Sequence, residues 1–88
     1  MNVFVVFDEY ETEVAGVYTN YTEADIIREA TMIIKECVED KWDDTFNPDA
    51  ILIKPFTTKS GMRMYYKDNG NMIWMVTITE ERIIDGED

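Results

Sequence analysis

Residues 21–44, YTEADIIREATMIIKECVEDKWDD, carry a long amphipathic pattern that decides how the rest of the chain folds. Thr22 is a favourable N-cap residue, and Asp25 three positions later completes the pattern of a capping box. Apolar residues then recur every three or four positions, as on the buried face of an α-helix. They are Ile26, Ile27, Ala30, Ile33, Ile34, Cys37, Val38 and Trp42. The pattern predicts one long helix whose apolar face packs on a core.

The opposite face of this helix is predicted to be acidic. Like charges four residues apart cost about 0.2–0.5 kcal/mol, and exposed acids at a C-terminal helix end cost about 0.3–1 kcal/mol each. Lys35 and Lys41 offset only part of this cost. The acids are Glu29, Glu36, Glu39, Asp40, Asp43 and Asp44. Folding alone favours basic residues here, although a solvated face kept acidic for solubility is an equally simple interpretation.

Charge is also segregated along the chain, whose 88 residues have a formal net charge of -11. Residues 1–49 hold 13 acids and 3 bases, residues 50–79 hold one acid and 4 bases, and residues 80–88 hold 5 acids and one base. The first of these regions includes Glu9, Glu11 and Glu13 in a predicted hairpin turn. A protein that is acidic only for solubility does not need this segregation.

The remaining pattern predicts five strands, over residues 3–7, 14–19, 50–56, 62–67 and 72–79. The first is unbroken and apolar, as in a central strand covered on both faces. Pro55 places the third at an edge or ends it. We therefore expect an α+β fold in ββαβββ order, with a mostly antiparallel sheet and one long amphipathic helix on one face. Residues 1–79 would form a single domain, and residues 80–88 an acidic tail.

The last two strands are predicted to form a hairpin around Asn69-Gly70, a strong signal for a two-residue type I′ turn. In that register Tyr65 opposes Trp74, and one face of the hairpin carries Tyr65, Trp74, Arg63 and Val76. One helix covers only one face of a sheet, so this second face would either be open to a partner or to a second copy in a homodimer, or be covered by the C-terminal tail folded over the sheet.

Several classes of chemistry are disfavoured. The chain has no histidine and a single cysteine, so we expect no metal site and no imidazole base, and it has no glycine-rich phosphate loop. We expect neither an enzyme nor a cofactor. Direct nucleic-acid binding is disfavoured because phosphate contacts require basic residues. The start of the chain lacks signal-peptide features, no stretch is apolar enough to span a membrane, and a lone Cys37 suits the cytoplasm.

A short, acidic, histidine-free domain of this kind resembles the small phage-encoded inhibitors that act as DNA mimics. Residues 3–25, VFVVFDEYETEVAGVYTNYTEAD, also resemble an N-terminal pattern of small phage proteins. The resemblance implies a basic nucleic-acid-binding protein of the host as partner, contacted in the host cytoplasm. The predicted contact residues are Glu9, Glu11, Glu13, Glu29, Glu36, Glu39, Asp40, Asp43 and Asp44. The alternative is a protein-interaction module that binds through the apolar face of the C-terminal hairpin.

Overall fold

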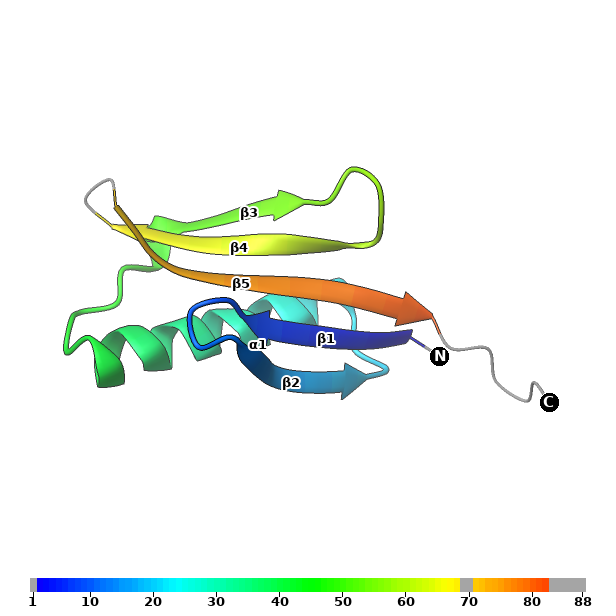
Figure 1. Cartoon of the computed structure of the whole chain (residues 1–88), viewed down its shortest axis with the longest axis horizontal. Coiled ribbons are helices and arrows are strands. Elements are labelled where there is room, and N and C mark those ends of the chain that lie inside the picture. Colours follow the sequence, from blue (N-terminus) through cyan, green and yellow to red (C-terminus); the bar gives the residue numbers. More distant parts are fainter. Residues whose placement is uncertain (1, 69–70, 83–88) are drawn as a thin grey trace.

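A computed structural model describes residues 2–68 and 71–82, which form a five-stranded antiparallel sheet with a helix across one face (Figure 1). The elements follow the order β1 (Asn2–Asp8), β2 (Glu13–Thr19), α1 (Glu23–Glu36), β3 (Ile51–Pro55), β4 (Gly61–Asp68) and β5 (Asn71–Arg82). A π-helical turn, η1 (Cys37–Lys41), prolongs α1, and a short 3-10 turn, η2 (Pro48–Ala50), precedes β3. The predicted α+β class and ββαβββ order are confirmed.

The strand order across the sheet is β2-β1-β5-β4-β3. β3 is an edge strand, as Pro55 predicts. β1 is second from the other edge and is not covered on both faces, contrary to the prediction. Phe4 and Val6 are buried toward the helix, whereas Val5 on the opposite face is only partly buried. The unbroken apolar run therefore reflects one buried face and one half-covered face.

β5 is longer than predicted. It continues beyond Thr79, because Glu80 pairs with Phe4 and Arg82 with Asn2 of β1. Residues 80–82 thus belong to the sheet rather than to a tail, and residues 83–88 lie outside the described part of the chain.

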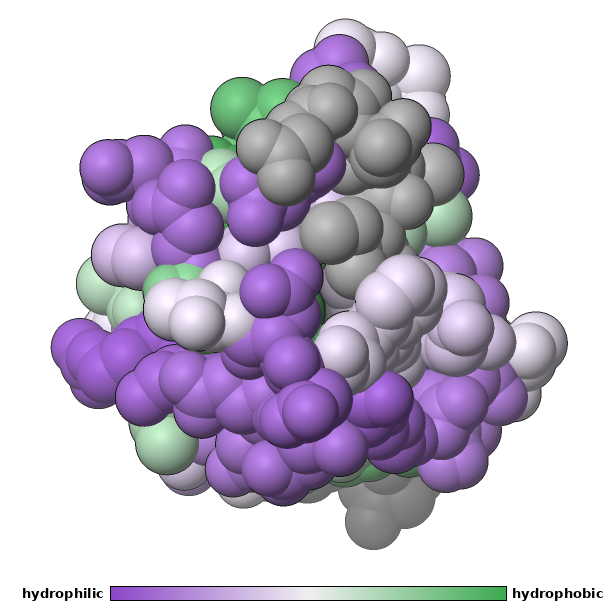
Figure 2. Space-filling view, turned by 90° about the vertical axis from the view of Figure 1, so that its left-hand side faces the viewer, coloured by the Kyte–Doolittle hydropathy of each residue, from purple (hydrophilic) through white to green (hydrophobic). Residues whose placement is uncertain are grey.

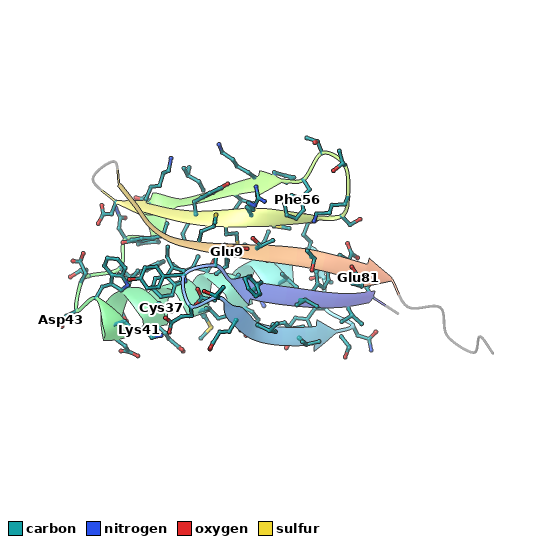
Figure 3. All side chains as sticks on the ribbon, in the orientation of Figure 1. Glu9, Cys37, Lys41, Asp43, Phe56 and Glu81 are labelled. Carbon is teal, nitrogen blue, oxygen red and sulfur yellow. The ribbon has the colours of Figure 1, made fainter. Side chains whose placement is uncertain are left out.

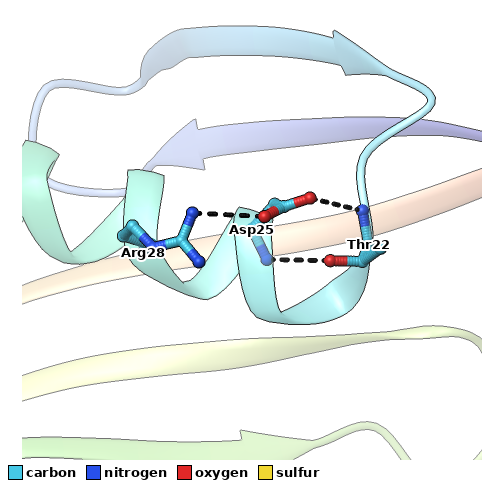
Figure 4. Close-up of polar contacts among 3 residues, drawn as sticks. All are labelled: Thr22, Asp25 and Arg28. Atoms are coloured by element: carbon cyan, nitrogen blue, oxygen red, sulfur yellow. Dashed lines mark hydrogen bonds and ion pairs between the residues drawn. The ribbon is translucent and has the colours of Figure 1, made fainter.

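The helix begins as the sequence predicts. The Thr22 hydroxyl accepts from the Asp25 backbone N–H at 3.1 Å, and the Asp25 carboxylate accepts from the Thr22 N–H at 3.2 Å (Figure 4). Arg28 adds an ion pair with Asp25 at 3.1 Å. The hydrogen bond from the Thr22 backbone N–H is the main reason why the pKa of Asp25 lies below its ordinary value, and the Thr22 side chain and Arg28 lower it further. The capping box is confirmed.

The helix and sheet enclose one core. Fully or almost fully buried apolar side chains come from α1, η1, η2 and strands β1, β4 and β5. The largest are Trp74, Tyr66, Ile26, Ile34, Met64, Ile78, Val6, Val38 and Val76. Trp42, the last position of the predicted apolar stripe, is 41% exposed. Trp42 follows the π-helical turn η1, and its ring meets the buried Trp74 ring edge-on with centroids 6.2 Å apart, so it lies at the border of the core.

The predicted register of the C-terminal hairpin is wrong by one residue. Trp74 pairs with Tyr66, and Met75 pairs with Tyr65. The pairs next to the turn, Lys67 with Met72 and Asp68 with Asn71, keep the predicted count, and the register shifts between Tyr66 and Lys67. Asn69 and Gly70 themselves lie outside the described residues. A one-residue slip moves every side chain to the other face. Trp74 and Val76 therefore face the helix and are buried, with exposures of 1% and 0%.

The sheet face away from α1 is called the open face below. Among the described residues no helix or strand covers it (Figure 1). Directly paired side chains share a face, so Tyr65 and Met75 lie on it together with Arg63 and Thr77. Val5 and Val17 form a second pair on this face. The face is mixed, with half-buried apolar side chains along β1 and β5 and exposed ones toward the edges.

Candidate interaction surface

The acidic residues of the hairpin turn and of the helix end meet at one end of the molecule. The β1–β2 turn lies beside the C-terminal half of α1 (Figure 1). An ion pair between Lys41 of η1 and Glu11 of the turn joins the two segments. Figure 2 looks at this end and shows hydrophilic residues across its lower half, where η1 and the following loop lie. Most of the predicted acidic contact residues are therefore gathered here.

The acids of α1 lie on the flank that faces β2. Glu29 and Glu36 are seven residues apart and share one side of the helix. Burial and then the charge of Glu29 raise the pKa of Tyr18 in β2, which places Glu29 close to that strand. The outer face of α1 also carries exposed Arg28, Met32 and Lys35, so it is not uniformly acidic as predicted. The acids form a flank, because the exposed face is shared with bases.

We use the name acidic edge for this surface. It comprises Glu11, Glu13, Glu29, Glu36, Glu39, Asp40, Asp43 and Asp44. Glu9 does not join it. The Thr77 hydroxyl donates to the Glu9 carboxylate at 2.6 Å, and the Glu9 backbone N–H donates to the Met75 carbonyl at 3.0 Å. Because Thr77 lies on the open face, Glu9 belongs to that side of the molecule (Figure 3).

Asp8 holds the hairpin turn in place, a role that the sequence analysis missed. It is only 4% exposed, and its Oδ1 accepts from the backbone N–H groups of Tyr10 at 2.9 Å and Glu11 at 3.0 Å. The backbone N–H of Thr12 donates to the Asp8 carbonyl at 2.8 Å, and Thr12 has a φ of 60°. An aspartate at the end of an apolar strand is a recognised turn signal, because its side chain bonds the backbone two residues on.

Three aromatic rings from separate segments pack together beside the acidic edge, and we call them the aromatic cluster. Tyr10 stacks on Trp74 with ring centroids 4.4 Å apart, and Trp42 meets Trp74 edge-on at 6.2 Å and Tyr10 at 5.5 Å. Tyr10 is 56% exposed and Trp42 is 41% exposed, whereas Trp74 is buried beneath them. The sequence pattern does not predict this contact, because the expected hairpin register put Trp74 on the face away from the helix.

Two further groups at this end are the indole N–H of Trp74 and the thiol of Cys37, which is only partly buried. The Trp74 indole N–H is buried and has no hydrogen-bond acceptor among the described residues. Burial, and then the negative charge of Asp8, raises the pKa of the Cys37 thiol from 9.0 to about 11. The thiol is therefore protonated at neutral pH, and a thiolate is the form that reacts as a nucleophile.

Basic residues lie at the other edge of the sheet. Lys54 is on β3 and Arg63 and Lys67 are on β4, whereas Glu13 of the acidic edge is on β2, at the opposite edge of the sheet, and Glu29 lies close to Tyr18 of that strand. The Lys54 ammonium lies 5.8 Å from the ring centroid of Tyr65, and Lys59 lies 4.7 Å from that of Phe56. The charge segregation of the sequence thus becomes a separation between two edges of one sheet.

Within residues 2–68 and 71–82, no three His, Cys, Asp or Glu side chains are grouped so as to hold a metal ion. No helix of that part of the chain has the length and apolar character needed to cross a membrane. Comparisons with protein-family models, with curated proteins and with solved structures found no match for this chain.

Proposed function

We propose that this protein is an inhibitor of the DNA-mimic type, as encoded by phages, which binds a basic nucleic-acid-binding protein of the host cytoplasm through the acidic edge. The observation that carries the proposal is the meeting of the acidic hairpin turn and the acidic helix end, joined by the Lys41–Glu11 ion pair, while the basic residues of β3 and β4 lie across the sheet from β2. Carboxylates three or four residues apart on a helix are about 5–6 Å apart. A duplex carries one negative charge per ~1.7 Å of axis, so both present closely spaced charge to a basic groove.

The charge of the whole molecule adds a kinetic advantage. A net charge of -11 attracts a basic partner over distances beyond direct contact and orients it toward the more negative edge. The Debye length is ~10 Å at 0.1 M salt, so this attraction weakens strongly as salt is added. Binding that depends on the acidic edge should therefore be tight at low salt and weak at high salt.

A charge-reversal experiment with a matched control tests the proposal. The test variant carries Glu36→Lys, Glu39→Lys and Asp40→Lys, and the control carries Glu23→Lys, Asp49→Lys and Glu81→Lys. All six positions are exposed, and both variants change the net charge equally. Asp43 is left out because its φ of 50° disfavours lysine.

The tagged proteins are used to capture partners from bacterial lysate at low and high salt. We expect the wild type and the control to capture nucleic-acid-binding proteins at low salt, and the test variant to capture none of them. The captured protein is then bound to a fluorescent duplex, which the wild type should displace. Equal capture by all three proteins, or capture without displacement of the duplex, contradicts the proposal.

The open face supports a second candidate, a module that binds a protein partner through apolar contacts. Val14 and Val17 on β2 and Leu52 on β3 are 54%, 59% and 43% exposed. Tyr65 of β4 is half-buried and pairs with Leu52. Of the hairpin residues predicted for this role, Tyr65 and Arg63 remain on the open face, whereas Trp74 and Val76 are buried. If the open face binds the partner, capture of that partner from lysate should be insensitive to salt. The double variant Val17→Ala and Tyr65→Ala should then abolish this capture. A second copy is one such partner, and light scattering of the purified protein tests for a homodimer.

A further inference from the structure

The aromatic cluster leaves two large rings exposed among negative charges. Tyr10 and Trp42 flank the buried Trp74, and each is more than two-fifths exposed. Glu11 follows Tyr10 and Asp43 follows Trp42 in the chain, and Glu11 carries the ion pair with Lys41. Aromatic faces next to carboxylates attract a cation through both the ring quadrupole and direct charge.

The molecule already places one of its own cations in this environment. The Lys41 ammonium pairs with Glu11 and lies 5.9 Å from the ring centroid of Trp74. The Lys41 side chain is 49% exposed, so it occupies the margin of the cluster and leaves Tyr10 and Trp42 accessible. This internal contact shows the chemistry that the cluster favours.

The backbone at this end is built in an uncommon way that positions the rings. η1 is a π-helical turn, a rare conformation that occurs often at functional sites. It carries Lys41 and is followed by Trp42, and both of these side chains contact the hairpin turn, through Glu11 and Tyr10. Asp8 fixes that turn from beneath through Tyr10 and Glu11. Both sides of the cluster are therefore held by structure rather than by loose loops.

We propose that the aromatic cluster, with the carboxylates around it, binds an arginine side chain presented by the basic partner. A planar guanidinium stacks on Trp and Tyr faces and also forms paired hydrogen bonds with carboxylates, whereas an ammonium is a compact, strongly hydrated charge. Arginine is also the residue that nucleic-acid-binding proteins use widely for phosphates and guanines. This inference rests on the proposed function and identifies the anchoring contact of the same surface.

The test uses a fluorescently labelled hexa-arginine peptide as the probe and a hexa-lysine peptide as its matched comparison. The chain has only two tryptophans, Trp42 and Trp74, and both belong to the cluster. Their intrinsic emission therefore reports binding at this place, and peptide anisotropy gives the affinity. We expect hexa-arginine to change the tryptophan emission and to bind more tightly than hexa-lysine.

Tyr10→Ala should weaken hexa-arginine binding roughly 3- to 30-fold, as expected for a lost cation–aromatic contact. Tyr21→Ala is the control, because Tyr21 is also an exposed tyrosine in an aromatic pair, with Tyr18 at 5.0 Å. It should leave the affinity unchanged. Circular dichroism of both variants verifies that they fold.

The outcomes separate this inference from the proposed function. Loss of peptide binding in the Glu36, Glu39 and Asp40 reversal variant, with no effect of Tyr10→Ala, overturns the arginine site and leaves the acidic edge standing. Equal affinities for hexa-arginine and hexa-lysine, or binding without a change in tryptophan emission, also overturn it. Peptide affinity that none of these variants alters contradicts both proposals.

Discussion

Replacing Asp8 by alanine should destabilise the protein and disorganise the end that carries the proposed contacts. Two backbone N–H groups, those of Tyr10 and Glu11, donate to Asp8 Oδ1 at 2.9 and 3.0 Å. A hydrogen bond to a charged acceptor contributes about 1.5–3 kcal/mol. Because Tyr10 and Glu11 are exposed, water satisfies part of what is lost, and repulsion from nearby carboxylates is relieved. We therefore expect a loss of about 2 kcal/mol in the free energy of unfolding.

Asp8→Asn is the matched control, because its side-chain oxygen still accepts both hydrogen bonds while the charge is removed. It should stay within about 1 kcal/mol of the wild type, since neutral hydrogen bonds contribute about 0.5–1.5 kcal/mol each. Urea unfolding followed by circular dichroism measures both variants. If alanine and asparagine destabilise equally, the charge of Asp8 and not its hydrogen bonds holds the turn, and the reasoning fails.

The same pair of variants has an independent readout at Cys37. The charge of Asp8 is one cause of the raised pKa of this thiol, after burial. Both variants should therefore lower the Cys37 pKa and speed its alkylation by iodoacetamide at pH 8–9, relative to the wild type. An unchanged alkylation rate in Asp8→Asn would mean that the carboxylate does not act on the thiol.

Three further predictions concern stability. Gly61→Ala should prevent or severely weaken folding in a thermal melt, because Gly61 has a φ of 126° and an added Cβ would lie 2.2 Å from the Ile78 carbonyl oxygen; a melting temperature like that of the wild type would contradict this geometry. Since the folded pKa of Cys37 is raised from 9.0 to about 11, its contribution to stability is present below pH 9 and is lost as pH rises through 11. The difference in unfolding free energy between wild type and Cys37→Ala should therefore shrink over that window, and a constant difference would argue against the shift. Moderate salt should raise the melting temperature by screening a net charge of -11, and a flat response would mean that the fold already compensates its acids.

Features fixed by neighbouring residues were predictable from the sequence, whereas features fixed across the fold were not. The capping box needs only Thr22 and Asp25, three residues apart, and Pro55 marks an edge strand because it lacks an N–H group. The hairpin register depends on a one-residue irregularity between Tyr66 and Lys67. A shift of one residue exchanges the side chains of the buried face with those of the open face. The sheet was correct in kind, but the face assigned to Trp74 was not.

The candidate surface was predictable to a similar extent. The acids of the hairpin and of the helix end could be named from charge segregation alone, because both groups lie within the acidic region of residues 1–49. The side on which each one lies could not be derived in this way. Glu9 turns to the open face through Thr77, a residue 68 positions away. The aromatic cluster also required Tyr10, Trp42 and Trp74, from three distant segments, to meet. No local sequence pattern predicts such a meeting.

The placement of charge is not what stability of the free protein would favour. Glu39 and Asp40 lie in the last turns of the helix, where the backbone dipole disfavours acids by about 0.3–1 kcal/mol each. Lys54, the basic residue of β3, is four strand spacings of ~4.8 Å from β2, or about 19 Å across the sheet. That separation exceeds the Debye length of ~10 Å at 0.1 M salt, so the basic edge offsets little of the repulsion. Exchanging a few charges between the two edges would relieve the helix end without altering the core. The cost is instead met by one lysine, Lys41, which pairs with Glu11 at the margin of the aromatic cluster. This arrangement leaves the acidic edge available to a positively charged partner, in keeping with the proposed function, and on the proposed arginine site the rings beside it would favour a guanidinium over an ammonium.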